Sequence, residues 1–190
     1  MATTRTYVVP FRRKRTGRTD YRVRRSLLAS GKPRLVVRLS LKHVWAQLVR
    51  SSPSGDAVLL SAHSQELAKK GYKGGLNNTP AAYLVGCLLG KKALKQQVKS
   101  AVADIGMLQA TKGARLFAVV KGAVDTGMDI PLDNAIVPDD KRMKGEHVAA
   151  YAVSLKADKT RYERQFSAYL KKGLRPEDLP KHIEDIKKGL

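Results

Sequence analysis

The chain has 190 residues, 43% of them hydrophobic, which is enough for the core of one domain with extensions. Its 37 Lys and Arg outnumber 16 Asp and Glu, and the resulting net charge of +21 predicts a polyanionic partner. A single cysteine, Cys87, excludes an internal disulfide, the four histidines have no metal-ligand spacing, and no apolar run is long enough to cross a membrane. We therefore expect a cytosolic protein that binds no cofactor, metal or small-molecule substrate and does not associate with a membrane.

The first 18 residues form a basic segment without an acid. Such a run cannot pack a core, so it predicts an RNA-binding arm that becomes ordered on its partner. An arginine-rich, acid-poor start is also typical of a mitochondrial transit peptide, although folded structure predicted from Thr19 leaves little room for one. The basic residues of the arm are Arg5, Arg12, Arg13, Lys14, Arg15 and Arg18.

A short helix is predicted over residues 20–30, with Thr19 or Asp20 as its N-cap. Its Leu27 and Leu28 are expected to face a core. The basic surface continues from the arm onto this helix through three side chains: Arg22, Arg24 and Arg25.

Three strands are predicted next, because apolar and polar residues alternate with a period of two over 34–39 and 44–49, and an apolar run follows at 57–62. The strand over 44–49 has Val44, Ala46 and Leu48 on one face and Trp45, Gln47 and Val49 on the other. Short connections between adjacent strands predict an antiparallel meander.

Helical periodicity dominates the rest of the chain. Helices are predicted over 80–98 and 116–127, with a short strand near 101–105 between them. Further helical stripes cover 143–155 and 162–170, before a last short helix that contains Ile183 and Ile186. The predicted fold class is α/β, with a mixed sheet that includes the antiparallel meander and is packed against helices. We divide the chain into the arm (1–18), an α/β RNA-binding domain (19–139) and a helical C-terminal extension (140–190).

Two sequence features leave alternatives open. Gly86 and Gly90 form a G-x-x-x-G pattern, which we interpret as close helix packing because the apolar run is too short for a membrane. Four aspartates could converge at one end of the sheet and bind Mg²⁺, as a nuclease requires, or could be separate surface and turn residues. They are Asp104, Asp125, Asp129 and Asp133.

The evidence for RNA binding is stronger, because arginine clusters bind phosphates and stack on exposed bases. Tyr7, Phe11 and Tyr21 lie among the arginines and supply aromatic faces. The connection from Arg38 to His43 is expected to present Ser, Lys and His donors at the end of the sheet. A non-specific polyanion-binding protein, which requires only charge, remains the rival hypothesis.

The sequence also resembles a known family along most of its length, the L-eighteen family of large-subunit ribosomal proteins. The matching segments, in chain order, are Thr19-Asp20-Tyr21, Gly31-Lys32-Pro33-Arg34-Leu35-Val36-Val37-Arg38, Ser40-x-Lys42-His43, Ala46-Gln47, Ser61-Ala62-His63-Ser64, Asn78-x-Pro80-Ala81-Ala82-Tyr83-Leu84-x-Gly86, Asp104-Ile105-Gly106 and Gly122-Ala123-x-Asp125-x-Gly127-x-Asp129-Ile130-Pro131. The length and the segment from Gly145 to Tyr151 resemble archaeal members, which are related to the eukaryotic L-five proteins.

The resemblance implies a non-enzymatic ribosomal protein that binds 5S rRNA and helps attach it to the large-subunit rRNA in the central protuberance, beside neighbouring ribosomal proteins. It implies a ribonuclease-H-like fold without the catalytic carboxylates. The RNA contacts that it implies fall on the arm, the first helix and the strand connection: Arg12, Arg13, Lys14, Arg15, Arg18, Tyr21, Arg22, Arg25, Arg38, Ser40, Lys42 and His43.

Overall fold

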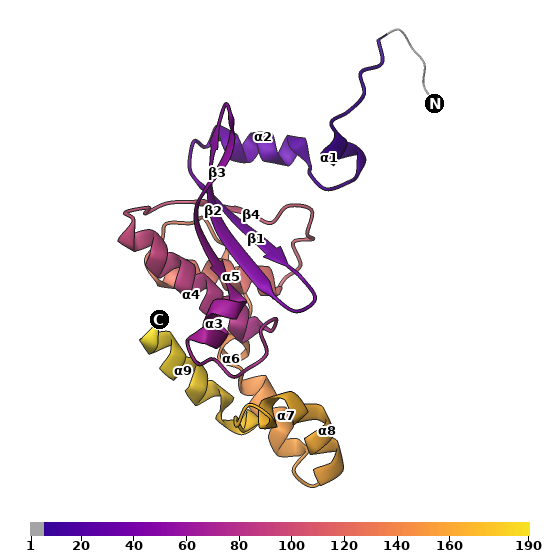
Figure 1. Ribbon diagram of the computed structural model, residues 1–190, viewed down its shortest axis with the longest axis vertical. Coiled ribbons are helices and arrows are strands. Elements are labelled where there is room, and N and C mark those ends of the chain that lie inside the picture. The colour runs from indigo at the N-terminus through magenta and orange to yellow at the C-terminus, as the bar shows by residue number, and fades with distance from the viewer. Residues whose placement is uncertain (1–5) are drawn as a thin grey trace.

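A computed structural model describes residues 6–190 (Figure 1). Its sheet has four strands in the order β3-β2-β1-β4. The first three strands pair antiparallel, and β4 pairs parallel to β1, so the mixed sheet with a meander is confirmed. The strands are β1 (Arg34–Leu39), β2 (Val44–Ser52), β3 (Gly55–His63) and β4 (Val102–Asp104).

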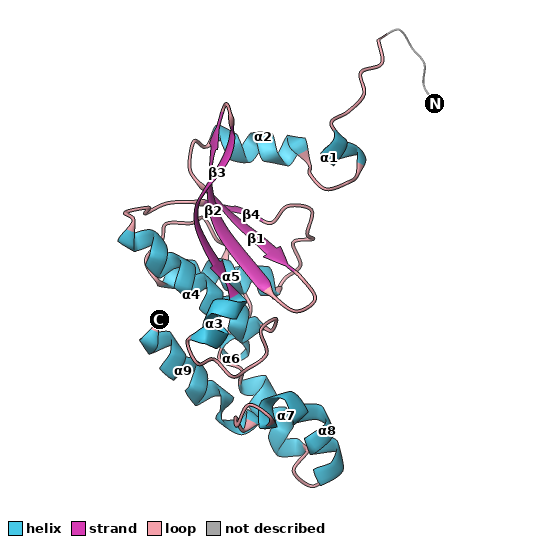
Figure 2. Cartoon of the chain, in the orientation of Figure 1, coloured by secondary structure: helices cyan, strands magenta, loops and turns pink. Residues whose placement is uncertain are grey.

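Two long helices cover one face of the sheet, which we call the inner face (Figure 2). They are α4 (Thr79–Lys95) and α5 (Arg115–Asp125). Against them lie side chains with no exposed surface: Val37, Val44, Ala46 and Leu48. The alternation predicted for β2 is therefore confirmed on this face. The predicted helix over 80–98 is shorter, because α4 ends at Lys95.

Helices α4 and α5 approach each other closely because glycines face the partner backbone. A Cβ atom on Gly86 would overlap the carbonyl oxygen of Val119, and one on Gly122 would overlap that of Tyr83. The interpretation of the glycine pattern as helix packing is confirmed. Cys87 is fully buried beside them, and burial raises the pKa of its thiol to about 11.

The N-terminal region contacts the body sparingly. It contains α1 (Arg12–Arg15) and α2 (Tyr21–Ala29), and neither helix has a buried residue. Asp20 caps α2, as predicted, by accepting hydrogen bonds from the N–H groups of Arg22 (2.8 Å) and Val23 (3.3 Å). The expectation that Leu27 and Leu28 face the core is wrong, because both are only half-buried and lie outside the core cluster. The single helical turn of α1 was not predicted, and Arg5 lies outside the described residues.

The C-terminal extension is helical, as predicted, but more broken. The expected helix over 143–155 is interrupted at Gly145, whose φ of 77° is left-handed and ends the preceding turn.

The short helix α3 (Ser64–Lys69) was not predicted from the sequence. Leu67 is its only buried apolar residue, so the segment has no repeating apolar pattern that would indicate a helix. None of the helices in residues 6–190 is long and apolar enough to cross a membrane. The remaining elements are α3 (Ser64–Lys69), a 3-10 turn (Asn134–Ile136), α6 (Asp140–Met143), α7 (Glu146–Ser154), α8 (Lys159–Leu170), a second 3-10 turn (Pro176–Asp178) and α9 (Leu179–Gly189).

Candidate nucleic-acid interface

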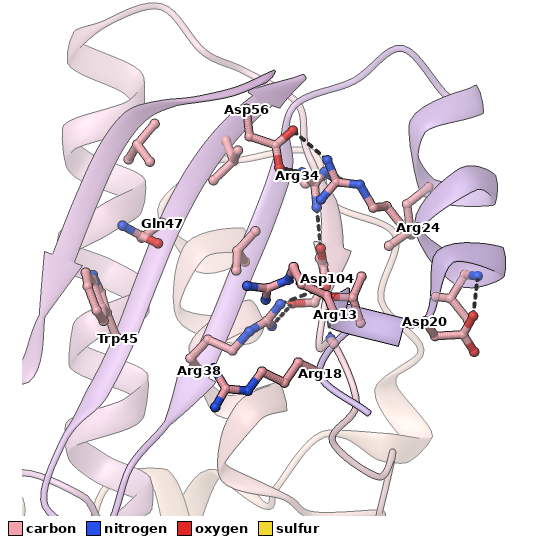
Figure 3. A pocket seen from close by; sticks show the side chains of 17 residues that line it. Arg13, Arg18, Asp20, Arg24, Arg34, Arg38, Trp45, Gln47, Asp56 and Asp104 are labelled. Atoms are coloured by element: carbon pink, nitrogen blue, oxygen red, sulfur yellow. Dashed lines mark hydrogen bonds and ion pairs between the residues drawn. The ribbon is translucent and has the colours of Figure 1, made fainter. Parts of the chain in front are cut away.

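A hollow of about 500 Å³ lies between the N-terminal region and the face of the sheet opposite α4 and α5, which we call the outer face (Figure 3). Strands β1, β2 and β3 form its floor, and the arm and α2 form one wall. It is lined by five arginines and three aspartates, so positive charge is in excess. The charged residues are Arg13, Arg18, Arg24, Arg34, Arg38, Asp20, Asp56 and Asp104.

The carboxylates of the floor are paired with arginines. Arg34, which is only 4% exposed, contacts Asp104 Oδ2 through Nη1 (2.6 Å) and Asp56 Oδ2 through Nη2 (2.7 Å). Arg24 reaches from α2 to Asp56 Oδ1 (2.9 Å) and so ties this helix to the sheet. Because each of these aspartates is neutralised by arginine, the floor does not repel an anion.

Asp56 is the residue that joins α2 to the floor. Burial raises the pKa of its carboxyl, but hydrogen bonds from Ser51 and Arg34, with the charges of Arg34 and Arg24, lower the pKa more strongly. The net result is a pKa below the usual value of 3.8, so Asp56 is ionised at neutral pH and holds both arginines.

Arg38 is held in the hollow with about half of its side chain still exposed. Its Nη1 donates to the carbonyl oxygens of Val37 (2.7 Å) and Asp104 (3.0 Å), and Nη2 lies 3.4 Å from Asp104 Oδ1. Gly106, with a φ of 65°, leaves room for this group, since a Cβ there would lie 2.8 Å from the Arg38 Cζ. The side chain is 46% exposed, so an anion that enters the hollow can reach it.

Three of the residues predicted from the sequence meet at this hollow: Arg13, Arg18 and Arg38. Arg13 is oriented by its Nε, which donates to Thr19 Oγ1 (2.9 Å). The Tyr21 ring packs against the exposed Phe11 ring with centroids 5.2 Å apart. The other predicted cations of this region are exposed on α1 and α2, outside the lining of the hollow: Arg12, Lys14, Arg15, Arg22 and Arg25.

The turn between β1 and β2 is held largely by its own hydrogen bonds. Ser40 Oγ accepts from the N–H of His43 (2.9 Å), and Asn77 Nδ2 donates to the carbonyl oxygens of Ser40 and Leu41 (2.9 Å each). His43 Nδ1 lies 3.0 Å from Ser64 Oγ. Lys42 is exposed. In this structure Ser40 and His43 fix the shape of the turn, and Lys42 lies exposed on it.

Most of the lining residues were not among the RNA contacts predicted from the sequence, including Arg34, Trp45 and Gln47, while Arg24 was predicted only as part of the basic surface of the first helix. The period-two pattern already placed Trp45 and Gln47 opposite the buried face of β2, which was the signal that could have identified them. Arg34 had no such signal, because its partner Asp104 is 70 residues away in the sequence.

The four aspartates considered for a nuclease do not come together. Asp104 pairs with Arg34, and Asp129 lies 3.4 Å from Lys32. Asp125 pairs with Lys121 and accepts a hydrogen bond from the Tyr83 hydroxyl, while Asp133 caps the turn at Ala135. Within residues 6–190, no group of three His, Cys, Asp or Glu side chains is placed to hold a metal ion. The predicted alternative of convergence is therefore wrong.

In sequence the chain is similar to one class of proteins, the large-subunit ribosomal proteins. The chain matches the family described as "Ribosomal large subunit proteins 60S L5, and 50S L18" over residues 5–103 and 95–133. It is 58% identical to the large ribosomal subunit protein uL18 of Methanococcus maripaludis over 190 residues, which cover 100% of this chain and 98% of that protein. It is 52% identical to the protein of the same name from Caldivirga maquilingensis over 189 residues, covering 98% and 91% of the two chains.

The chain therefore belongs to this family of large-subunit ribosomal proteins. Both relatives come from archaea, so the archaeal resemblance inferred from the length and the C-terminal segment is confirmed. Membership places the chain among ribonucleoprotein components that serve translation.

Proposed function

We propose that the protein binds 5S rRNA and helps attach it to the large-subunit rRNA in the central protuberance. The observation that carries this proposal is the hollow on the outer face, where five arginines from the arm, α2 and β1 surround a floor whose aspartates are already paired. An RNA backbone supplies the anionic groups that this excess of positive charge favours.

The arm and α2 supply most of the affinity in this mechanism. Their exposed cations neutralise phosphates and release counterions, a contribution that does not depend on sequence. Arg38 and the turn from Ser40 to His43 provide shape recognition, because hydrogen bonds to the sheet and to Asn77 hold Arg38 and the turn backbone in place. Lys42 supplies an exposed charge on this turn.

The proposed role is structural rather than enzymatic. The ribosome in the cytoplasm is the site of action, and neighbouring large-subunit proteins together with large-subunit rRNA are the further partners. Helices α7 and α8 of the extension lie at the other end of the molecule from the arm (Figure 1), which leaves them available for such contacts while the arm holds 5S rRNA.

Filter binding of the full chain to transcribed 5S rRNA of Methanococcus maripaludis tests the proposal. We expect this RNA to bind at least about tenfold more tightly than an unrelated structured RNA of equal length. Affinity should fall with salt by roughly 0.7–0.9 log units per log unit for each phosphate neutralised. Equal affinity for both RNAs, or for duplex DNA, would favour the non-specific polyanion binder instead.

A pair of charge-matched variants separates the arm from general charge. The arm variant replaces Arg12, Arg13, Lys14, Arg15 and Arg18 with Gln. The control variant replaces five exposed lysines elsewhere with Gln: Lys69, Lys70, Lys171, Lys181 and Lys188. The arm variant should lose affinity and flatten the salt dependence, whereas the control should change little. Equal losses in both would remove the arm from the mechanism.

A further inference from the structure

A row of side chains, one from each of β1, β2 and β3, crosses the outer face of the sheet. In the strand register, Trp45 on β2 lies between Arg38 on β1 and His63 on β3. Its neighbours Val44 and Ala46 are fully buried on the inner face, while Trp45 is 48% exposed. The alternation of the strand therefore places the indole on the outer face, where it lines the hollow (Figure 3).

The indole is held in place by a fixed neighbour. The rings of Trp45 and His63 meet edge to face, with centroids 6.0 Å apart and an interplanar angle of 82°. His63 is itself fixed as the N-cap of α3, because its Nδ1 accepts from the N–H of Gln65 (3.1 Å) and its own N–H donates to Glu66 Oε1 (3.0 Å). An aromatic face that is oriented before binding loses little entropy when a ligand stacks on it.

The surroundings of the indole select an anionic, planar ligand. Arg38 is its direct cross-strand neighbour, and Arg13 and Arg18 line the same hollow. A volume of about 500 Å³ lies within the range of roughly 300–1,000 Å³ that is typical of small-ligand pockets. A stacking face beside phosphate-binding cations is the combination that proteins use for unpaired nucleotides.

We propose that Trp45 is a stacking platform for one unpaired base of the bound RNA, with Arg38, Arg13 and Arg18 holding the adjacent phosphates. This inference rests on the proposed RNA-binding function and adds the recognition of a single-stranded base to it. His63 acts as a positioning residue that limits rotation of the indole.

The chain has a single tryptophan, so its fluorescence reports on this position alone. Addition of the Methanococcus maripaludis 5S transcript to the full chain should quench the emission and protect the indole from acrylamide. Trp45→Leu should weaken binding on the order of 5- to 140-fold, whereas Trp45→Phe should retain most of the affinity because a ring face remains. Tyr151→Leu is the matched control, because Tyr151 is 49% exposed but lies on α7 in the C-terminal extension.

The outcomes separate this inference from the function on which it rests. Selective 5S binding with unchanged emission and unchanged acrylamide access would overturn the stacking role and leave 5S binding intact. A Phe variant as weak as the Leu variant would also contradict stacking. Failure to bind 5S rRNA selectively, measured by filter binding, would overturn the proposed function first. The fluorescence of the unaltered protein keeps the test valid even where a variant folds poorly.

Discussion

The inner and outer faces of the sheet come from alternating residues of the same strands, yet the two long helices α4 and α5 cover only the inner face. On the inner face, Ala46 and Leu48 are fully buried against α4 and α5. On the outer face, Trp45 and Arg38 remain about half exposed beneath a wall that has no buried residue of its own. The difference indicates that apolar packing is concentrated on the inner face, while much of the outer face remains accessible.

Arg34 is the outer-face residue that should behave most like the core. It is buried between Asp104 and Asp56, and its loss leaves the Asp104 carboxylate without its shortest ion pair. We expect Arg34→Ala to lower the free energy of unfolding by about 3–5 kcal/mol, measured by urea denaturation. In a double-mutant cycle with Asp104→Ala, the combined loss should be clearly smaller than the sum, and simple additivity would show that the two residues are not coupled.

Leu48 and Gln47 compare the two faces at adjacent positions of β2. Leu48→Ala should cost about 2–5 kcal/mol of unfolding free energy, because it opens a cavity under α4. Gln47→Ala, on the outer face, should stay within about 0.5 kcal/mol. Urea denaturation of both variants measures the contrast. Similar losses would mean that Gln47 stabilises the fold as much as a residue of the buried core does.

Gly106 tests whether the orientation of Arg38 matters. Gly106→Ala places a Cβ against the Arg38 guanidinium and strains a left-handed backbone, so we expect a loss of roughly 1–2 kcal/mol in stability. The 5S affinity, measured by filter binding at a temperature where the variant is folded, should fall as well. Gly113→Ala is the control, because it has a similar φ of 73° but nothing within 4 Å of the new Cβ. An equal loss of affinity in the control would dismiss the role of Arg38.

Asp56 should give the smallest effect, and one that depends on pH. Its pKa is lowered in the folded state, so its contribution to stability is present above the ordinary value of 3.8 and is lost as the pH falls further. Urea denaturation from neutral pH to about pH 3 should show a shallower loss in Asp56→Asn than in the unaltered chain. Identical pH dependence would indicate that the contact between α2 and the sheet contributes no stability.

The sheet was predictable because its information is local. The alternation from Val44 to Leu48 marks the buried face, and short connections between the strands favour the meander. The helix break at Gly145 and the short helix α3 were missed, since neither leaves a strong periodic pattern.

The candidate site was only partly predictable, because it is assembled from distant segments. Charge identified Arg13, Arg18 and Arg38, but not the hollow that they share. Spacing left open whether Asp104 belonged to a metal site, and the fold places it against Arg34 from another strand. The position of α2 over the sheet could not be predicted either. An ion pair between Arg24 and Asp56 ties this helix to the sheet, and no sequence pattern indicates that these two distant residues meet.

Ultraviolet cross-linking of 5S rRNA to the full chain, followed by mass spectrometry of the joined peptides, tests most directly whether RNA occupies the outer face. Peptides from residues 12–25 and 38–47 should carry the cross-linked nucleotides, because these segments line the hollow or flank it. Cross-links confined to residues 146–170, in α7 and α8, would place the RNA at the opposite end of the molecule from the arm and contradict the assignment of RNA binding to the outer face.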